Sequence, residues 1–190
     1  EARMLNLKVA SHTSGGPAIT TAVKNGIHSV EHGHWLNNET IDEMKKNNTF
    51  YVPTLLVNER NFEFKSDDLF RSSKNWKWLE LSREAKWLSL EKAIKSNVNI
   101  AVGTDAGFML PHGSMNYREI ELLVQGGLSN MQAIKCATQV GGKLIEMNVG
   151  TIEVGQRADI LVINGNPLKD IKVLKNKKNI KVFKDGKPTF

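Results

Sequence analysis

Apolar residues occur along this chain in short runs separated by longer amphipathic stretches. The short runs have the length and β-branched content of buried strands. In the first part of the chain they cover residues 7–12, 28–32, 49–56 and 99–105. The stretches between them carry apolar residues three and four positions apart, which predicts helices over residues 18–26, 39–47 and 82–96. Alternating strands and helices are typical of a parallel α/β sheet with right-handed crossovers.

The helices and the remaining segment carry their own signals. Asn38 is expected to cap the second helix, and Ser129 to cap a helix that runs to about residue 140. Residues 116–125 predict a further amphipathic helix. Residues 57–77 hold charged and aromatic side chains without a clear period, and a connection of that length is uncommon unless it has a function. A functional loop or lid is therefore expected there.

The chain changes character after about residue 148. Residues 150–164 form a glycine-bounded turn followed by a β-prone run, and residues 180–187 form a further strand with an Asp-Gly turn. Strands without intervening helices indicate a separate small β domain. We therefore predict an α/β domain over residues 1–148 and a β domain over residues 149–190.

Three of the predicted strands end on side chains that bind metals. The first ends at His12, the second at His32 and the fourth at Asp105. The carboxyl ends of parallel strands lie together above a sheet or barrel, where such folds keep their chemistry. Two imidazoles and a carboxylate form a donor set that suits zinc. The pattern therefore predicts a hydrolytic metal site.

The composition is that of a globular protein, with 190 residues of which 40% are hydrophobic and 24% charged. The single cysteine, Cys136, excludes an intrachain disulfide and favours a cytoplasmic setting. The first residues read as the last turn of a helix, with neither a start methionine nor an apolar signal core. We therefore expect the chain to begin within a fold.

The net charge of +6 raises the question of a nucleic-acid or membrane partner. Much of the excess lies near the end of the chain, in Lys169, Lys172, Lys175, Lys177, Lys178, Lys181, Lys184 and Lys187. These lysines alternate with apolar residues, as in a helical turn followed by an edge strand, where lysines discourage aggregation. We therefore predict a solvated face, with neither nucleic acid nor membrane as a partner.

An ordered series of motifs runs along nearly the whole chain. It consists of VASH, SVEHG, YVPTL, AVGTDAG, PHG, REIELLVQGG and GTIEVGQRADILVINGNP. Together these motifs resemble the carboxy-terminal half of the amidohydrolase superfamily, especially imidazolonepropionase-like amidohydrolases and the Xaa-Pro dipeptidase-related group. The resemblance implies strands five to eight of a metal-dependent TIM-type (β/α)8 barrel, followed by carboxy-terminal strands of a small β-sandwich.

The resemblance also implies an activity and roles for the strand ends. His12 and His32 match metal ligands, and Asp105 matches the carboxylate that binds metal and takes a proton from the attacking water. The implied cofactor is one or two divalent ions, with zinc as the expected metal. The implied reaction is hydrolysis of a C–N bond in a small-molecule or dipeptide-like substrate, such as an amide, a peptide or a cyclic amide.

Family members also carry a His-X-His pair on the first barrel strand and, in binuclear members, a carboxylated lysine on the fourth. Both would lie upstream of Glu1, and a closed barrel needs eight strands. Three interpretations stay open: a truncated amidohydrolase completed by missing sequence, a half-barrel that pairs with another chain as a homo-oligomer, and a noncatalytic binding or assembly module. A deaminase of the same superfamily is a further alternative, although Gly15 stands where those enzymes commonly place a glutamate.

Four further residues are candidate substrate contacts, and each has a plainer alternative. His34 is either a substrate contact or an exposed loop histidine, and Tyr51 either enters the pocket or fills the barrel wall. His112 lies in the loop after the eighth barrel strand, where family members often contact substrate, and its alternative is a surface turn. Arg118 is either a clamp for a substrate carboxylate or a partner in an ordinary salt bridge.

Overall fold

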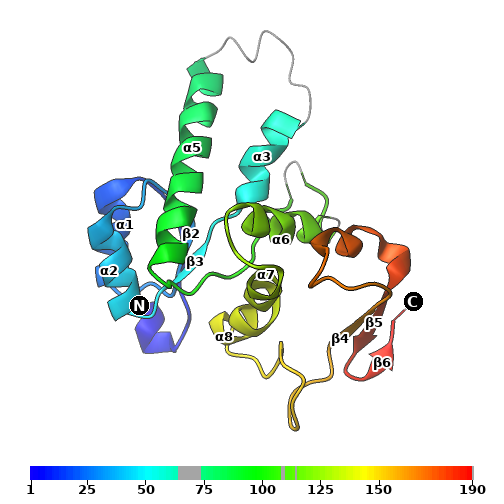
Figure 1. The fold of residues 1–190 in the computed structure, drawn as a ribbon. Coiled ribbons are helices and arrows are strands. Elements are labelled where there is room, and N and C mark those ends of the chain that lie inside the picture. The colour runs from blue at the N-terminus through cyan, green and yellow to red at the C-terminus, as the bar shows by residue number, and fades with distance from the viewer. Residues whose placement is uncertain (64–73, 108–109, 114, 190) are drawn as a thin grey trace.

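The structure is a computed structural model that describes residues 1–63, 74–107, 110–113 and 115–189 (Figure 1). A short 3-10 helix, η1 (Ala2–Leu5), precedes a parallel sheet whose strands are β1 (Ala10–Ser14), β2 (Ser29–His34) and β3 (Phe50–Val52), in that order. The connections are α1 (Gly16–Lys24) and α2 (Asn38–Lys46). The alternating strand and helix order is therefore confirmed for this part of the chain.

Several local details differ from the sequence prediction. The cap of α2 is Asn37 rather than Asn38, because the Asn37 side chain accepts a hydrogen bond from the Thr40 N–H at 2.8 Å. The first strand runs to Ser14 and so continues beyond His12. The second strand likewise continues beyond His32, to His34, and the third covers only Phe50–Val52 of the predicted range 49–56. These differences leave the parallel order unchanged.

The fourth predicted strand is reduced to one parallel bridge at Ile100. There the N–H of Tyr51 donates to the carbonyl of Asn99 at 2.8 Å. Two residues after Ile100, the N–H of Val102 donates to the carbonyl of Cys136 at 3.3 Å. The predicted strand is therefore shorter than expected. The N–H of Ala101 still donates to the Tyr51 carbonyl, but the next ladder position on the β3 side is Pro53, which has no N–H to donate.

The segment predicted as a loop or lid is helical over its described part. Helix α3 (Leu55–Glu63) begins two residues after β3, so Leu55 and Leu56 are helical rather than part of the predicted strand. Helix α5 (Lys74–Lys95) begins well before Ser82. These two helices lie against each other and rise beyond the sheet (Figure 1). Residues 64–73 lie outside the described residues. The loop prediction is therefore wrong for the described ends of this segment.

The start of α3 is capped by a side chain distant in the sequence. Glu119 lies in α6 (Asn116–Gln125), is fully buried, and accepts hydrogen bonds from the N–H groups of Leu55 at 2.8 Å and Leu56 at 2.7 Å. A carboxylate at a helix N-terminus satisfies backbone donors and interacts favourably with the helix dipole. Burial nevertheless raises the pKa of Glu119 to about 7, against the lowering effect of these donors.

The helices that follow confirm the predicted positions and add one irregularity. Helix α6 has the predicted bounds, and Ser129 caps α7 (Asn130–Lys135) in a reciprocal capping box. The predicted continuation to residue 140 is a π-helical turn, η2 (Cys136–Val140), followed by α8 (Gly141–Leu144). These helices and the sheet share one apolar core, which includes Ile19, Val30, Met44, Tyr51, Leu56, Leu90, Leu122 and Leu123.

The last part of the chain forms a second, antiparallel sheet. Its strands are β4 (Ile160–Ile163), β5 (Ile180–Lys184) and β6 (Lys187–Pro188), and the short 3-10 helices η3 (Ile171–Lys175) and η4 (Lys177–Asn179) precede β5. The expected Asp-Gly turn joins β5 to β6. Strand β5 is central rather than an edge strand, because it pairs with both neighbours. The eight lysines of this region are nevertheless exposed.

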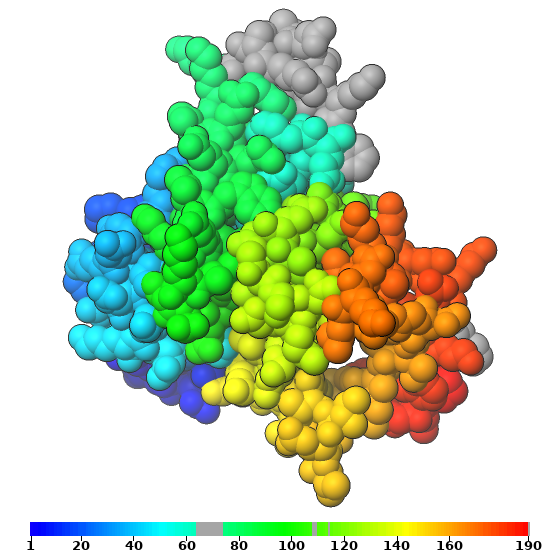
Figure 2. Space-filling model, in the orientation of Figure 1, coloured from blue at the N-terminus to red at the C-terminus, as the bar shows by residue number. Residues whose placement is uncertain are grey.

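This sheet lies on the far side of α6, α7 and α8 from α1 and α2 (Figure 1). The segment that joins β4 to β5, orange in Figure 2, packs against the yellow-green helices. There the Asn130 side chain donates to the carbonyls of Pro167 at 3.1 Å and Leu168 at 3.0 Å. No helix within the described residues has the length and apolar character needed to cross a membrane.

We expect Glu119→Gln to lower the free energy of unfolding by about 1–3 kcal/mol. The NH₂ group of glutamine would face one of the two backbone N–H groups, and that N–H would lose its acceptor. Urea unfolding measures the change. The matched control is Glu91→Gln, which removes an exposed partner of Lys95 and should cost no more than about 0.5 kcal/mol. Equal losses in the two variants would show that α3 does not depend on Glu119.

Candidate functional site

The two strand-end histidines lie in contact. His12 is in β1 and His32 in β2, and their rings meet edge to face with centroids 4.5 Å apart and planes at 71°. The register pairs His32 with Thr13 of the neighbouring strand. Parallel pairing therefore brings together the two imidazoles that the sequence predicts as ligands.

His32 is a buried ring with one nitrogen engaged. It is 7% exposed, and its Nδ1 lies 2.6 Å from the hydroxyl oxygen of Thr54, which follows β3. Burial lowers the pKa of His32 to about 4; the charges of Lys86 and His12 act in the same direction, and that of Asp105 opposes them. The ring is therefore neutral near pH 7, which is the form that binds metal ions.

Asp105 lies at the end of the segment that contains the Ile100 bridge, and it is exposed. Its negative charge raises the pKa of Glu31, a smaller effect than the burial of that carboxyl group. Glu31 precedes His32, pairs in register with His12, and accepts a hydrogen bond from the Ser29 hydroxyl at 2.5 Å. Glu31 is thus a second carboxyl group near the strand ends, which the sequence analysis did not select.

The donor chemistry fits a divalent metal, although the ligand set is incomplete. Imidazole nitrogens and a carboxylate oxygen are ligands that zinc accepts. Within the described residues, no group of three or more histidine, cysteine, aspartate or glutamate side chains is arranged to hold a metal ion. The structure therefore brings His12 and His32 together without closing a three-ligand site around them, and the ligand roles stay a prediction.

Two of the candidate substrate contacts are buried. Tyr51 is fully buried, and its hydroxyl donates to the carbonyl of His32 at 3.1 Å, so it fills the wall beneath the site. His34 is 4% exposed, which excludes the alternative of an exposed loop histidine. Its Nδ1 lies 3.3 Å from the Ser14 hydroxyl, and the Trp78 ring lies 6.2 Å from its ring.

The other two candidates lie at the surface or in an ion pair. His112 is exposed, and its ring lies beside Gly107, where an added Cβ would meet Nε2 at 3.4 Å. Arg118 forms ion pairs with Glu63 and, at 2.9 Å, with Glu121. The structure thus shows the salt bridge that was the alternative for Arg118.

Three buried polar residues beside the histidines were missed by the sequence analysis. Lys86 of α5 is 1% exposed and donates to the Thr54 carbonyl at 3.0 Å and to the Asn58 side-chain oxygen at 2.5 Å. Thr54 has a left-handed φ of 46°. The one sequence signal for Thr54 was its position after Pro53, near the end of a predicted strand. Lys86 lies on α5 and Asn58 on α3. The local sequence pattern does not show which face of either helix lies against the strand ends.

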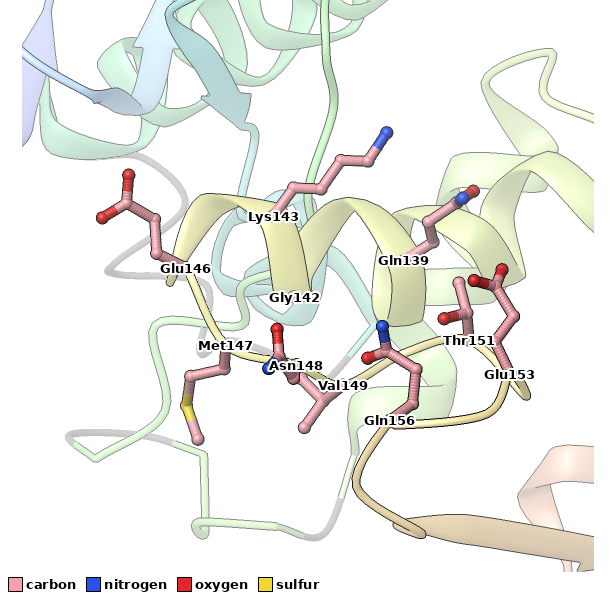
Figure 3. Close-up of a pocket in the computed structure, with 10 residues that line it drawn as sticks. All are labelled: Gln139, Gly142, Lys143, Glu146, Met147, Asn148, Val149, Thr151, Glu153 and Gln156. Carbon is pink, nitrogen blue, oxygen red and sulfur yellow. The ribbon is translucent and has the colours of Figure 1, made fainter.

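A separate pocket of ≈ 400 Å³ lies between α8 and the loop that follows it (Figure 3). Its lining includes Lys143, Glu146 and Gln156, and none of the predicted site residues. Glu146 also pairs with Lys8, which precedes β1, at 2.6 Å. This part of the pocket is therefore near the amino end of the strands, whereas catalytic residues in such folds lie at the carboxyl ends.

Parallel strands with polar side chains gathered at their carboxyl ends define an α/β protein of the class that carries its chemistry there. The chain belongs to the amidohydrolase family, whose model matches residues 1–189. The resemblance found in the sequence motifs is therefore confirmed.

Individual relatives are hydrolases by name. Ochratoxinase from Aspergillus niger is 31% identical over 192 aligned residues, which cover 98% of this chain and 39% of that protein. The structure of a Xaa-Pro dipeptidase with bound methionine gives a TM-score of 0.86 at 33% identity, covering 99% of this chain and 46% of that one. A prolidase complexed with N-methylphosphonate-L-proline gives 0.80 at 28% identity, covering 100% and 46%. The chain thus spans less than half the length of these relatives.

We expect the free energy of unfolding to fall as the pH drops from about 6.5 to about 4. Burial lowers the pKa of His34 to about 3 and that of His32 to about 4, from an ordinary value of 6.5. In this window the two rings bind protons in the unfolded chain but not in the folded one, which disfavours the folded state. This effect of two groups outweighs the opposite contribution of Glu119, whose pKa is raised in the folded state. Urea unfolding at a series of pH values in the presence of a chelator measures the slope, and His34→Asn should flatten it. A folded-state ring titration near pH 6.5 for both histidines would contradict this.

Proposed function

We propose that this chain supplies the carboxy-terminal half of a metal-dependent amidohydrolase barrel. In this assignment β1, β2, β3 and the segment through Ile100 are strands five to eight, and the antiparallel sheet contributes to a small β-sandwich. The observation that carries the proposal is the contact between His12 and His32 at the carboxyl ends of paired parallel strands. The family assignment and the coverage of less than half of each compared relative support it.

The chain's own residues have distinct roles in the proposed reaction. His12 and His32 would hold a divalent cation, expected to be zinc, with Asp105 as a third ligand. When bound, such an ion supplies a water-derived nucleophile at neutral pH and polarises the substrate carbonyl. Asp105 is exposed at the end of its segment, so its carboxylate is available to take the proton of the attacking water. The bond broken is the C–N bond of an amide.

The substrate class is proposed from the relatives. A Xaa-Pro dipeptidase and a prolidase act on dipeptide-like compounds by name, and ochratoxinase is named for a small-molecule toxin. We infer a small amide or dipeptide for this chain as well. His34 and His112 are the residues that we assign to substrate contact, while Arg118 is already paired with Glu63 and Glu121.

Completion of the barrel requires further strands. Within the described residues, β1 pairs with β2 alone, which leaves one edge of the parallel sheet open. We propose that the missing ligands and strands come from a preceding segment or a second polypeptide. Two alternatives are a half-barrel that pairs with its own copy and a noncatalytic assembly module. The turnover measurement below distinguishes them from the proposal.

We expect Asp105→Asn to lower turnover by about 10²–10⁴-fold, because the carboxylate that accepts the proton is lost. The measurement is hydrolysis of a panel of N-acyl amino acids and Xaa-Pro dipeptides by the chain joined to the amino-terminal half of a relative. Asp42→Asn, an exposed change on α2, is the control and should leave turnover unchanged. Near-normal turnover of the Asp105 variant would refute the assignment. Full turnover by this chain alone would instead refute the half-barrel.

A further inference from the structure

A series of buried hydrogen bonds joins α5 to His32 through Thr54. Lys86 donates to the Thr54 carbonyl at 3.0 Å, to the Thr54 hydroxyl at 3.4 Å and to the Asn58 side-chain oxygen at 2.5 Å. The Thr54 hydroxyl lies 2.6 Å from Nδ1 of His32. All four residues are buried, with Lys86 at 1% and Thr54 at 3% exposure. This series of hydrogen bonds therefore connects helix α5 to the histidine ring that we assign as a metal ligand.

Thr54 needs outside support for its conformation. Its φ of 46° lies in the left-handed region, which β-branched residues rarely adopt. Lys86 bonds both to its backbone carbonyl and to its side-chain hydroxyl, so one ammonium group holds the backbone and the hydroxyl together. In this conformation the hydroxyl reaches the His32 ring rather than its own backbone.

The hydrogen-bonding capacities of the two groups allow Thr54 to accept from both Lys86 and His32. A threonine hydroxyl has two lone pairs and one proton, whereas a lysine ammonium has protons only. Lys86 therefore uses one lone pair of Thr54, and the second is available to accept from His32. The same hydroxyl can instead donate to Nδ1, and the two arrangements give opposite tautomers, which the first experiment below distinguishes. A neutral imidazole that donates at Nδ1 keeps an unprotonated Nε2, and in metal sites the partner of the second ring nitrogen fixes which nitrogen binds.

We propose that Lys86 and Thr54 are positioning residues for His32. Lys86 holds Thr54 in its left-handed conformation, and the Thr54 hydroxyl accepts the Nδ1 proton of His32, so that Nε2 carries the free lone pair. This inference deepens the proposed function, on which its metal-binding part rests. The tautomer part concerns the metal-free chain and can be judged separately.

The first experiment reads the tautomer of His32 directly. The ¹⁵N-labelled chain, freed of metal with a chelator, is examined by long-range ¹H–¹⁵N correlation of its histidine rings. We expect wild type to hold the Nδ1-protonated tautomer, and Thr54→Val to lose this preference, because valine offers no acceptor. Thr54→Ser should restore it, since the hydroxyl returns. Thr20→Val, which removes a buried hydroxyl bonded to Thr40, is the matched control and should leave His32 unchanged.

Lys86 is tested in the same way with a control on its own helix. Lys86→Met keeps most of the side-chain volume and removes the donors, so the His32 tautomers should mix as in Thr54→Val. Lys92→Met removes another α5 lysine, one that donates to the Leu36 carbonyl at 3.0 Å, and should leave His32 unchanged. If Lys86→Met fails to fold, Lys86→Gln keeps a donor and is read instead. An Nε2-protonated ring in wild type, or an unchanged ring in Thr54→Val, would overturn the proposal.

Zinc binding by equilibrium dialysis separates this inference from the proposed function. We expect Thr54→Val to weaken zinc binding about tenfold or more, the size typical of losing a partner of a ligating histidine, while Thr54→Ser stays close to wild type. If the wild-type chain joined to an amino-terminal half binds no zinc, the metal-dependent function fails, and the tautomer result still decides the positioning role. Zinc bound equally by wild type and Thr54→Val would overturn the positioning role while leaving the function intact.

Discussion

The parallel sheet and the candidate site both depend on Tyr51, whose backbone pairs with two neighbouring segments and whose hydroxyl bonds to His32. Its backbone pairs with Val30 of β2 on one side and forms the bridge to Ile100 on the other. Its ring is fully buried, and its hydroxyl donates to the carbonyl of His32 at 3.1 Å. Burial also raises the pKa of Tyr51, which keeps the phenol a hydrogen-bond donor. One residue, through its backbone and its side chain, therefore links the end of β2 to the segment that leads to Asp105.

The strand ends share an unusual backbone conformation. His32, Thr54 and Asp105 have φ values of 66°, 46° and 52°, in the left-handed region that costs free energy for residues with a Cβ. Such residues persist where surrounding bonds hold them, and they cluster at functional sites. Gly33 follows His32 within β2, and there a Cβ would lie 2.6 Å from the Tyr51 ring. The polar side chains at these ends thus depend on packing beneath them.

The sequence predicts those features of the fold that local pattern determines. The strand-end histidines, the bounds of α6 and the capping box at Ser129 follow from periodicity and from side chains within one turn. The N-terminus of α3 does not, because Glu119 supplies its hydrogen-bond partner from a distant helix. The same limit explains why the proximity of His12 and His32 was predictable, whereas the buried polar residues around them were found only in the structure.

The buried ammonium of Lys86 has an electrostatic consequence for the site. Burial lowers the pKa of Lys86 to about 8, while the charges of Glu119, Asp105 and Glu59 favour its charged form. A pKa of about 8 leaves most of the population protonated near pH 7. That positive charge disfavours a proton on His32, as does burial of the ring. The cation that holds Thr54 therefore also keeps the neighbouring imidazole neutral, so geometry and charge both favour a ring able to bind a cation.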